Sequence, residues 1–170
     1  NIFIQLDDYG FKIQDYFNNK LHKSLHSMKS INFHGSNLNN YIKTPKPIKI
    51  LGSGVNYNIS KLLSLNLNTR FKKTFSFDVL ENHKHIDISS ESKLIILIGN
   101  IKNDFYHKDA YAEILKFLAH KNDCFIFVDD YNKNIYENIN HARLNFCTHD
   151  KIDEDFSFIF YLLLFERYLK

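Results

Sequence analysis

The chain has 170 residues, of which 44% are hydrophobic, which is enough for one domain with a sizeable core and argues against a second domain. The formal net charge is +3 and the lysines are scattered among Asp and Glu, without the concentrated positive charge of a nucleic-acid-binding surface, so we expect no nucleic acid as a partner. The longest apolar run, residues 159–165, is far shorter than the roughly 20 residues that cross a bilayer, and no signal peptide opens the chain, so we expect no membrane contact.

The chain opens with a polar, Asn-rich stretch that carries a weak helical period. We predict a leading helical or linker segment over residues 1–43. Residues 44–47, Thr-Pro-Lys-Pro, then end any helix, because proline removes an amide donor and biases the preceding residue towards extended geometry. Residues 44–170 are predicted to form the main domain.

Four apolar, β-branched or aromatic runs follow in this main domain. Continuous apolar runs are typical of strands that are buried on both faces of a sheet. The four runs are residues 48–51, 93–98, 124–128 and 144–147. A fifth and weaker candidate, residues 71–77, places three phenylalanines on one face, and we expect it nearer an edge of the sheet.

Between these runs the apolar residues recur with a period near 3.6, most clearly over residues 55–67 and 110–118. Strands that alternate with helices pair in parallel through right-handed crossovers. The pattern therefore predicts an α/β fold, a doubly wound three-layer αβα sandwich with a five-stranded, mostly parallel sheet. The last stretch, residues 156–168, is apolar nearly all round and predicts a helix buried between the sheet and another surface, such as a homodimer interface.

The first candidate site follows the first of the four runs. In an open parallel sheet, ligands bind beyond the carboxyl ends of the strands, and Gly52-Ser53-Gly54 lies there at the start of a helix. We expect the amides of Val55, Asn56 and Tyr57 to face an anion, with the Ser53 hydroxyl as a further donor. A tight turn without a ligand is the alternative interpretation.

Two nucleotide-binding patterns are excluded at this turn. The dinucleotide fingerprint needs a small residue at position 57, where this chain has Tyr57, and no Gly-Lys-Ser/Thr triplet follows. We therefore expect neither NAD nor a nucleoside triphosphate, and no cofactor.

The second candidate site is the dense acid/base stretch of residues 81–87, after the weaker strand. A histidine transfers protons near neutral pH and a carboxylate can act as a base, so Glu81, His83 and His85 are candidates for proton transfer. A solvated loop is the alternative. The spacing of His83 and His85 would also suit two metal ligands, but no further ligand set is evident, and we predict no metal site.

Two further features carry weaker signals. Asp129-Asp130 closes the run at 124–128, where the pair could bind a hydroxyl group or Mg²⁺ or could instead cap a turn. Cys124 and Cys147 lie in apolar runs without ligand-like spacing, which favours buried thiols over a disulfide and suits a reducing cytoplasm.

The order of elements resembles the sugar-isomerase (SIS) domain family, in particular the second SIS domain of glucosamine-fructose-6-phosphate aminotransferases. The resemblance covers about residues 46–169 and rests on the Leu-Gly-x-Gly turn at Leu51–Gly54, the helix and edge-like strand after it, and the Lys-His pair Lys84-His85. It implies a domain that binds a phosphosugar, with Lys84 beside the substrate and His85 assisting ring opening. It also implies, as partners, a sugar phosphate and either a second copy of the chain or a preceding SIS domain.

The sequence departs from the family at the catalytic positions. Thr69 replaces the glutamate that shuttles a proton, Asn66 replaces a lysine, and residues 99–104 lack the hydroxyls of the family's Ser/Thr-rich loop. Glu81 is then the best remaining base. Two functions stay open: an aldose–ketose isomerase of sugar phosphates or amino-sugar phosphates, or the C-terminal part of one, and a non-catalytic SIS module that senses a sugar phosphate or mediates dimerisation. A flavodoxin-like or receiver-like domain is disfavoured, because a receiver's acidic pair would cluster near the first strand.

Overall fold

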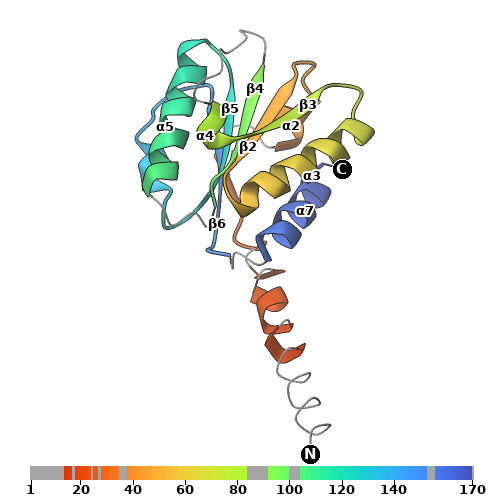
Figure 1. The fold of residues 1–170 in the computed structure, drawn as a ribbon. Helices are drawn as coiled ribbons and strands as arrows, with labels where there is room; N and C mark the ends of the chain where they lie inside the picture. Colours follow the sequence, from red (N-terminus) through yellow and green to blue (C-terminus); the bar gives the residue numbers. More distant parts are fainter. Residues whose placement is uncertain are drawn as a thin grey trace, which may run out of the picture.

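Among the described residues, a six-stranded sheet forms the middle of the molecule, with helices on both of its faces (Figure 1). The computed structural model describes residues 14–16, 18–23, 25–26, 28–34, 38–83, 92–99, 104–152 and 156–169. The strands are β1 (Asn32–His34), β2 (Ile48–Gly52), β3 (Phe75–Val79), β4 (Lys93–Leu97), β5 (Cys124–Asp129) and β6 (Leu144–His149). Their order across the sheet is β1-β6-β5-β4-β2-β3.

Strands β2 to β6 pair in parallel, as the alternation of strands and helices predicted. The α/β three-layer architecture is thereby confirmed. The expected number of five strands is wrong by one, because β1 adds a short antiparallel strand beside β6, with Phe33 opposite Cys147. The weak candidate at 71–77 is indeed an edge strand, but β3 begins only at Phe75, because residues 71–73 form bends.

The helices that cover the sheet are α2 (Leu38–Lys43), α3 (Val55–Arg70), α4 (Leu80–His83), α5 (Asp104–Ala119), α6 (Asn134–Glu137) and α7 (Ser157–Tyr168). Two apolar clusters fill the two faces of the sheet. Helices α2, α3 and α7 pack on one face, where Ile95 and Leu97 point, and α4, α5 and α6 pack on the other, where Leu94 and Ile96 point. Alternate residues of a strand face opposite sides, so a strand covered on both sides must be apolar throughout.

The leading segment divides into two parts. The helical residues between 14 and 26 extend away from the body of the molecule (Figure 1), whereas α2 is part of the core, since Leu38, Tyr41 and Ile42 are at most 2% exposed. The Tyr41 hydroxyl lies 2.8 Å from the carbonyl oxygens of both Leu94 and Asp123, to which it can donate. The domain boundary at residue 43 stays a prediction, and α2 shares the core of the predicted main domain.

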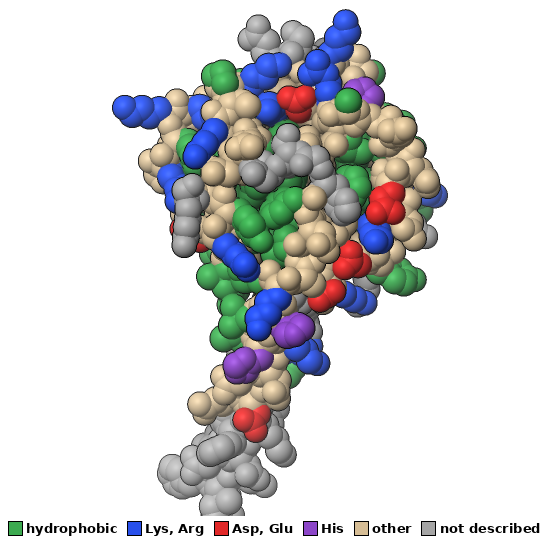
Figure 2. All heavy atoms as spheres, turned by 180° about the vertical axis from the view of Figure 1, so that it is seen from behind, with side chains coloured by type: hydrophobic (Ala, Val, Ile, Leu, Met, Phe, Trp, Pro, Cys, Tyr) green, Lys and Arg blue, Asp and Glu red, His purple; other side chains and the backbone are tan. Residues whose placement is uncertain are grey.

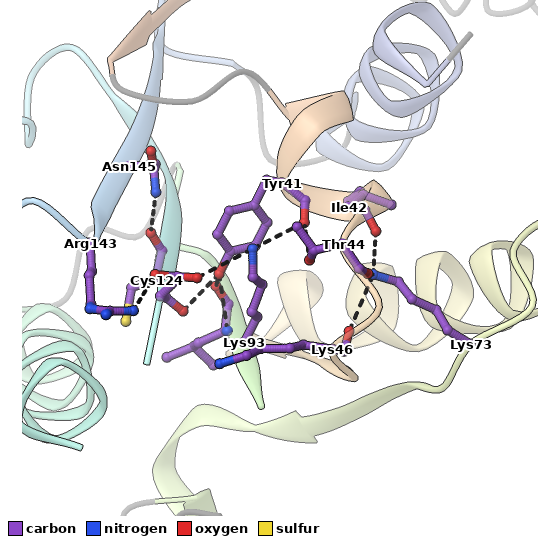
Figure 3. Close-up of polar contacts among 11 residues, drawn as sticks. Tyr41, Ile42, Thr44, Lys46, Lys73, Lys93, Cys124, Arg143 and Asn145 are labelled. Carbon is purple, nitrogen blue, oxygen red and sulfur yellow. Dashed lines mark hydrogen bonds and ion pairs between the residues drawn. The ribbon is translucent and has the colours of Figure 1, made fainter. Parts of the chain in front are cut away.

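Lys73 lies near Lys93 at the end of the sheet where the parallel strands begin (Figure 3). Lys73 donates from Nζ to the carbonyl oxygens of Ile42, Thr44 and Lys46, at 2.7 Å for Thr44 and 3.3 Å for Lys46. Burial, together with the nearby charge of Lys93, lowers the pKa of Lys73 to about 8. These contacts tie the start of β3 to the segment that leads into β2.

On the face seen in Figure 2, Lys and Arg side chains are spread over the molecule, with Asp and Glu among them, rather than gathered into one patch. Within the described ranges, no helix is both long and apolar enough to span a membrane.

Candidate functional site

The turn after β2 depends on its two glycines for different reasons. Gly54 has φ of 56° and ψ of −125°, a conformation that favours glycine. At Gly52, a Cβ would lie 2.8 Å from the Tyr57 nitrogen and closer still to the carbonyl group of Asn56. The backbone can therefore reverse from strand to helix in three residues, which brings the start of α3 against the end of β2.

The backbone amides of this turn differ from the sequence-based expectation. The Asn56 and Tyr57 amides donate to the carbonyl oxygens of Ser53 and Gly54, each at 3.1 Å, so they are not available to an anion. These bonds arise because the helix begins with a tight turn, which uses amides that an ideal helix end leaves unpaired. The amides of Gly54 and Val55 make no hydrogen bond to any described residue.

Asn56 connects the start of α3 to the end of β4. Its side chain is 4% exposed, and Nδ2 donates to the carbonyl oxygens of Leu97 at 3.1 Å and Gly99 at 3.0 Å. Both protons of the side-chain amide are thus used within the protein. The predicted role of Asn56 in holding a ligand stays a prediction, and the contacts seen give it a structural role.

Two predicted residues keep a free oxygen atom at this rim. Ser53 is 3% exposed, and its Oγ is buried without a hydrogen-bond partner among the described residues. Oε2 of Glu81 is likewise buried and unpartnered within those residues. Ser53 follows β2 and Glu81 follows β3, and these strands pair in parallel with Gly52 opposite Val79. A buried oxygen without a partner is costly, and a bound molecule is one way of satisfying it.

Of the predicted acid/base stretch at 81–87, the structure describes residues 81–83, and Glu81 and His83 have different surroundings. His83 is 1% exposed and lies between α4 and α5, where its Nδ1 is 2.8 Å from Oε2 of Glu113. Lys84 and His85 lie outside the described residues. In the part of the chain that the structure describes, no three His, Cys, Asp or Glu side chains are grouped to hold a metal ion.

A second polar group at the carboxyl ends of the strands was not predicted. His149 at the end of β6 is fully buried, its Nδ1 donates to the Asp150 carbonyl oxygen at 2.8 Å, and its Nε2 lies 3.4 Å from the Tyr161 hydroxyl. A Cβ on Gly99 would lie 2.5 Å from that hydroxyl and 2.6 Å from Nε2. Burial lowers the pKa of His149 and raises the pKa of Tyr161, which favours the neutral form of each side chain.

The weaker sequence signals have structural explanations. Asp129 accepts hydrogen bonds from the backbone amide of Asn132 at 3.0 Å and from its side-chain amide, as the turn-capping alternative predicted. Cys124 and Cys147 are buried free thiols, and burial raises the pKa of each. The prediction of buried thiols is confirmed, and a high thiol pKa makes them poor nucleophiles.

Neither a protein-family model nor a curated protein matches the sequence. Solved structures are similar to it in fold. The C-terminal domain of glucosamine-fructose-6-phosphate aminotransferase from Francisella tularensis has a TM-score of 0.66 and 16% identity, over 93% of this chain and 43% of that one. Tagatose-6-phosphate ketose/aldose isomerase from Escherichia coli has a TM-score of 0.57 and 12% identity, over 75% of this chain and 38% of the enzyme.

A third structure has nearly the same extent as this chain. The sugar isomerase domain of the RpiR transcription factor from Sphaerobacter thermophilus has a TM-score of 0.60 and 11% identity, over 92% of this chain and 88% of that domain. The first two structures are more than twice as long as their matched parts, so this chain spans less than half of each. At these identities the likeness concerns the fold. The chain has the fold of the sugar-isomerase (SIS) domains.

Proposed function

We propose that the chain binds a sugar phosphate at the carboxyl ends of β2 and β3. The observation that carries the proposal is the pair of buried oxygens without partners among the described residues, Oγ of Ser53 and Oε2 of Glu81, which follow neighbouring parallel strands. Two of the similar structures are enzymes whose names include a 6-phosphate of a sugar. This supports a phosphosugar as the ligand class.

The two oxygens suit different parts of such a ligand. A phosphate group accepts hydrogen bonds, and the Ser53 hydroxyl and the amides of Gly54 and Val55 can donate them beside the start of α3, where the helix dipole also favours an anion. A sugar hydroxyl can donate to the Glu81 carboxylate, which accepts such bonds when ionised. In this arrangement the phosphate lies over β2 and the sugar extends towards β3.

We propose binding rather than turnover as the basic activity of this chain. Thr69, which stands at the position of the family's proton-shuttling glutamate, lies in the last turn of α3, and its hydroxyl donates to the Asn66 carbonyl oxygen at 2.7 Å. At 1.5 Å per residue, it lies about 20 Å along the helix from the turn at Ser53. Isomerisation at the proposed site would therefore need Glu81 as the base and His85 for ring opening, and both roles stay proposals.

The binding test is a titration of the protein with each ligand, measured by calorimetry. Thermal unfolding with and without the ligand is the second measurement. Glucosamine-6-phosphate and fructose-6-phosphate should bind and raise the melting temperature, whereas fructose and inorganic phosphate should each bind more weakly. Ser53→Ala should weaken binding by about tenfold, because one hydrogen bond to a charged group is worth about 1.5 kcal/mol. Ser60→Ala is the matched control, since Ser60 is a buried serine of α3 whose hydroxyl donates within the helix, to Tyr57.

Two results would count against the proposal. The absence of binding by any sugar phosphate would refute it. Equal losses of affinity in Ser53→Ala and Ser60→Ala would show that the ligand does not bind at the turn. An NMR assay for interconversion of fructose-6-phosphate and glucose-6-phosphate decides between the two functional classes. Turnover that Glu81→Gln abolishes would make the chain an isomerase, and binding without turnover would support a sensor.

A second candidate function is association with a second copy of the chain through α3 and α7. These helices lie side by side (Figure 1). The Arg70–Glu166 ion pair, at 3.3 Å, joins them. Five large apolar side chains on the two helices are more than a third exposed: Val55, Leu62, Leu65, Phe158 and Leu163. Exposed apolar groups gathered on adjacent elements are a common feature of interaction surfaces.

The oligomeric state can be measured by light scattering during size-exclusion chromatography. We expect a dimer that Leu65→Glu converts to a monomer. Leu115→Glu is the control, because Leu115 is a similarly exposed leucine on α5, at the opposite face of the sheet. A monomeric wild-type chain, or equal effects of both substitutions, would refute this interface.

A further inference from the structure

His83 and Glu113 form a contact that is buried between α4 and α5. Both side chains are 2% exposed, and Nδ1 of His83 lies 2.8 Å from Oε2 of Glu113. The other carboxylate oxygen, Oε1, lies 3.8 Å from Nζ of Lys116. The His83 ring also packs near the Phe117 ring, with 5.7 Å between centroids. A histidine and a glutamate at the apolar interface of α4 and α5 call for an explanation other than core packing.

The pair joins the candidate site to the middle of α5. Helix α4 has only four residues, and both of its ends are held: Leu80 is fully buried in the apolar cluster beneath α5, and His83 is bound to Glu113. Residues three apart lie on the same side of a helix, so these two contacts fix the rotation of α4 about its axis. Glu81 lies between them in the sequence, about 100° around the helix from Leu80, and its Oε2 is buried and unpartnered among the described residues.

We propose that the buried His83–Glu113 pair is a positioning device, which fixes α4 so that the Glu81 carboxylate faces the ligand; this rests on the binding site proposed above. A four-residue helix makes few backbone hydrogen bonds of its own, so its orientation depends on side-chain contacts. A hydrogen bond is directional, whereas an apolar contact tolerates rotation. Glu113 and His83 therefore act on the ligand through Glu81 and do not touch it.

The test separates orientation from stability by replacing both partners. Breaking a buried pair by removing one partner destabilises a protein, but replacing both by apolar residues of similar volume is often neutral or stabilising. The double variant His83→Leu/Glu113→Leu should thus keep the wild-type melting temperature. Glu113→Gln is the conservative variant, because its amide oxygen can still accept the proton of His83.

Two measurements are made on each variant: hydrogen exchange of the α4 amides, and affinity for glucosamine-6-phosphate. In the double variant we expect exchange in α4 to be faster by about tenfold and the affinity to fall by a similar factor, since local order is lost without global unfolding. Glu113→Gln should keep most of the wild-type protection of α4 and most of the wild-type affinity. Tyr136→Phe is the matched control, because it removes a buried contact of 2.8 Å between α5 and α6, the one to His107, and leaves α4 untouched.

The outcomes distinguish this inference from the function on which it rests. If hydrogen exchange in α4 is unchanged in the double variant, the pair does not hold α4, and this refutes the inference whatever the affinity for glucosamine-6-phosphate. Faster exchange with unchanged affinity refutes the positioning role. A wild-type chain that binds no sugar phosphate refutes the proposed function and, with it, the role of the pair in binding, while the exchange data still decide whether the pair holds α4.

Discussion

The close contact between Gly52 and α3 makes a sharp prediction. A methyl group at position 52 would lie 2.8 Å from the Tyr57 nitrogen, where an ordinary contact needs at least 3.4 Å, and its nearest neighbours are backbone atoms that cannot rotate away. The first turn of α3 must then move, and this movement breaks the two hydrogen bonds from the Asn56 side chain to the end of β4. Overpacking costs about 2 kcal/mol and each lost bond about 1 kcal/mol, so Gly52→Ala should lower the free energy of unfolding by about 4 kcal/mol.

Urea denaturation followed by circular dichroism measures this loss. Because part of it comes through Asn56, Gly52→Ala should cost about 2 kcal/mol less in an Asn56→Ala background, a coupling that a double-mutant cycle detects. Asn58→Ala, at an exposed position of the same helix, should change stability by less than about 0.5 kcal/mol. A cost below about 1 kcal/mol for Gly52→Ala, or strict additivity with Asn56→Ala, would refute the reasoning.

Three other predictions concern the remaining contacts at the two ends of the sheet. Gly99→Ala should destabilise the fold by about 1–3 kcal/mol, and adding Tyr161→Phe should relieve part of this loss because it removes the hydroxyl nearest the new methyl group. Thermal unfolding of the two single variants and of the double variant measures both effects. The pKa of His149 is lowered in the folded state, so its contribution to stability is present above the unfolded value of about 6.5 and is lost as the pH falls below it. Urea denaturation should therefore show that the free energy of unfolding declines from pH 8 to pH 5. The slope of this decline should be shallower in His149→Gln, by up to about 1.4 kcal/mol per pH unit, and should be the same as in the wild type in the exposed control His120→Gln. Lys73→Met should cost about 1.5–3 kcal/mol in thermal or urea unfolding, because three carbonyl groups lose the ammonium that bonds them.

The buried strands were predictable because their apolar runs are continuous. The run at 48–51 became β2 with one added residue, and the run at 124–128 became β5 in the same way. Strand β1 could not be predicted, because Asn32–His34 has only one apolar residue and becomes a strand through its pairing with β6. Pairing with a strand more than 100 residues away leaves no local signal in the sequence.

The candidate site was predictable in place and only partly in detail. Ser53 and Glu81 lie at the carboxyl ends of their strands as expected, because glycine spacing and parallel topology determine where the rim is. The partners of Asn56 and His83 could not be foreseen. Asn56 bonds to Leu97 and Gly99, about 40 residues away, and His83 bonds to Glu113, 30 residues away. Such contacts are decided by packing between elements and not by the pattern within one element.

The hydrogen bonds of Tyr41 have a consequence for the order in which the chain folds. Its hydroxyl is held by backbone groups 53 and 82 residues further along, at the starts of β4 and β5. During synthesis α2 emerges long before these acceptors, so the Tyr41 hydroxyl does not have both of them until the start of β5 has left the ribosome. Contacts of such high sequence separation slow folding, because a long loop must close before they form. A nascent chain that ends before residue 123 should therefore leave Tyr41 open to proteolysis, and one that extends past β5 should protect it.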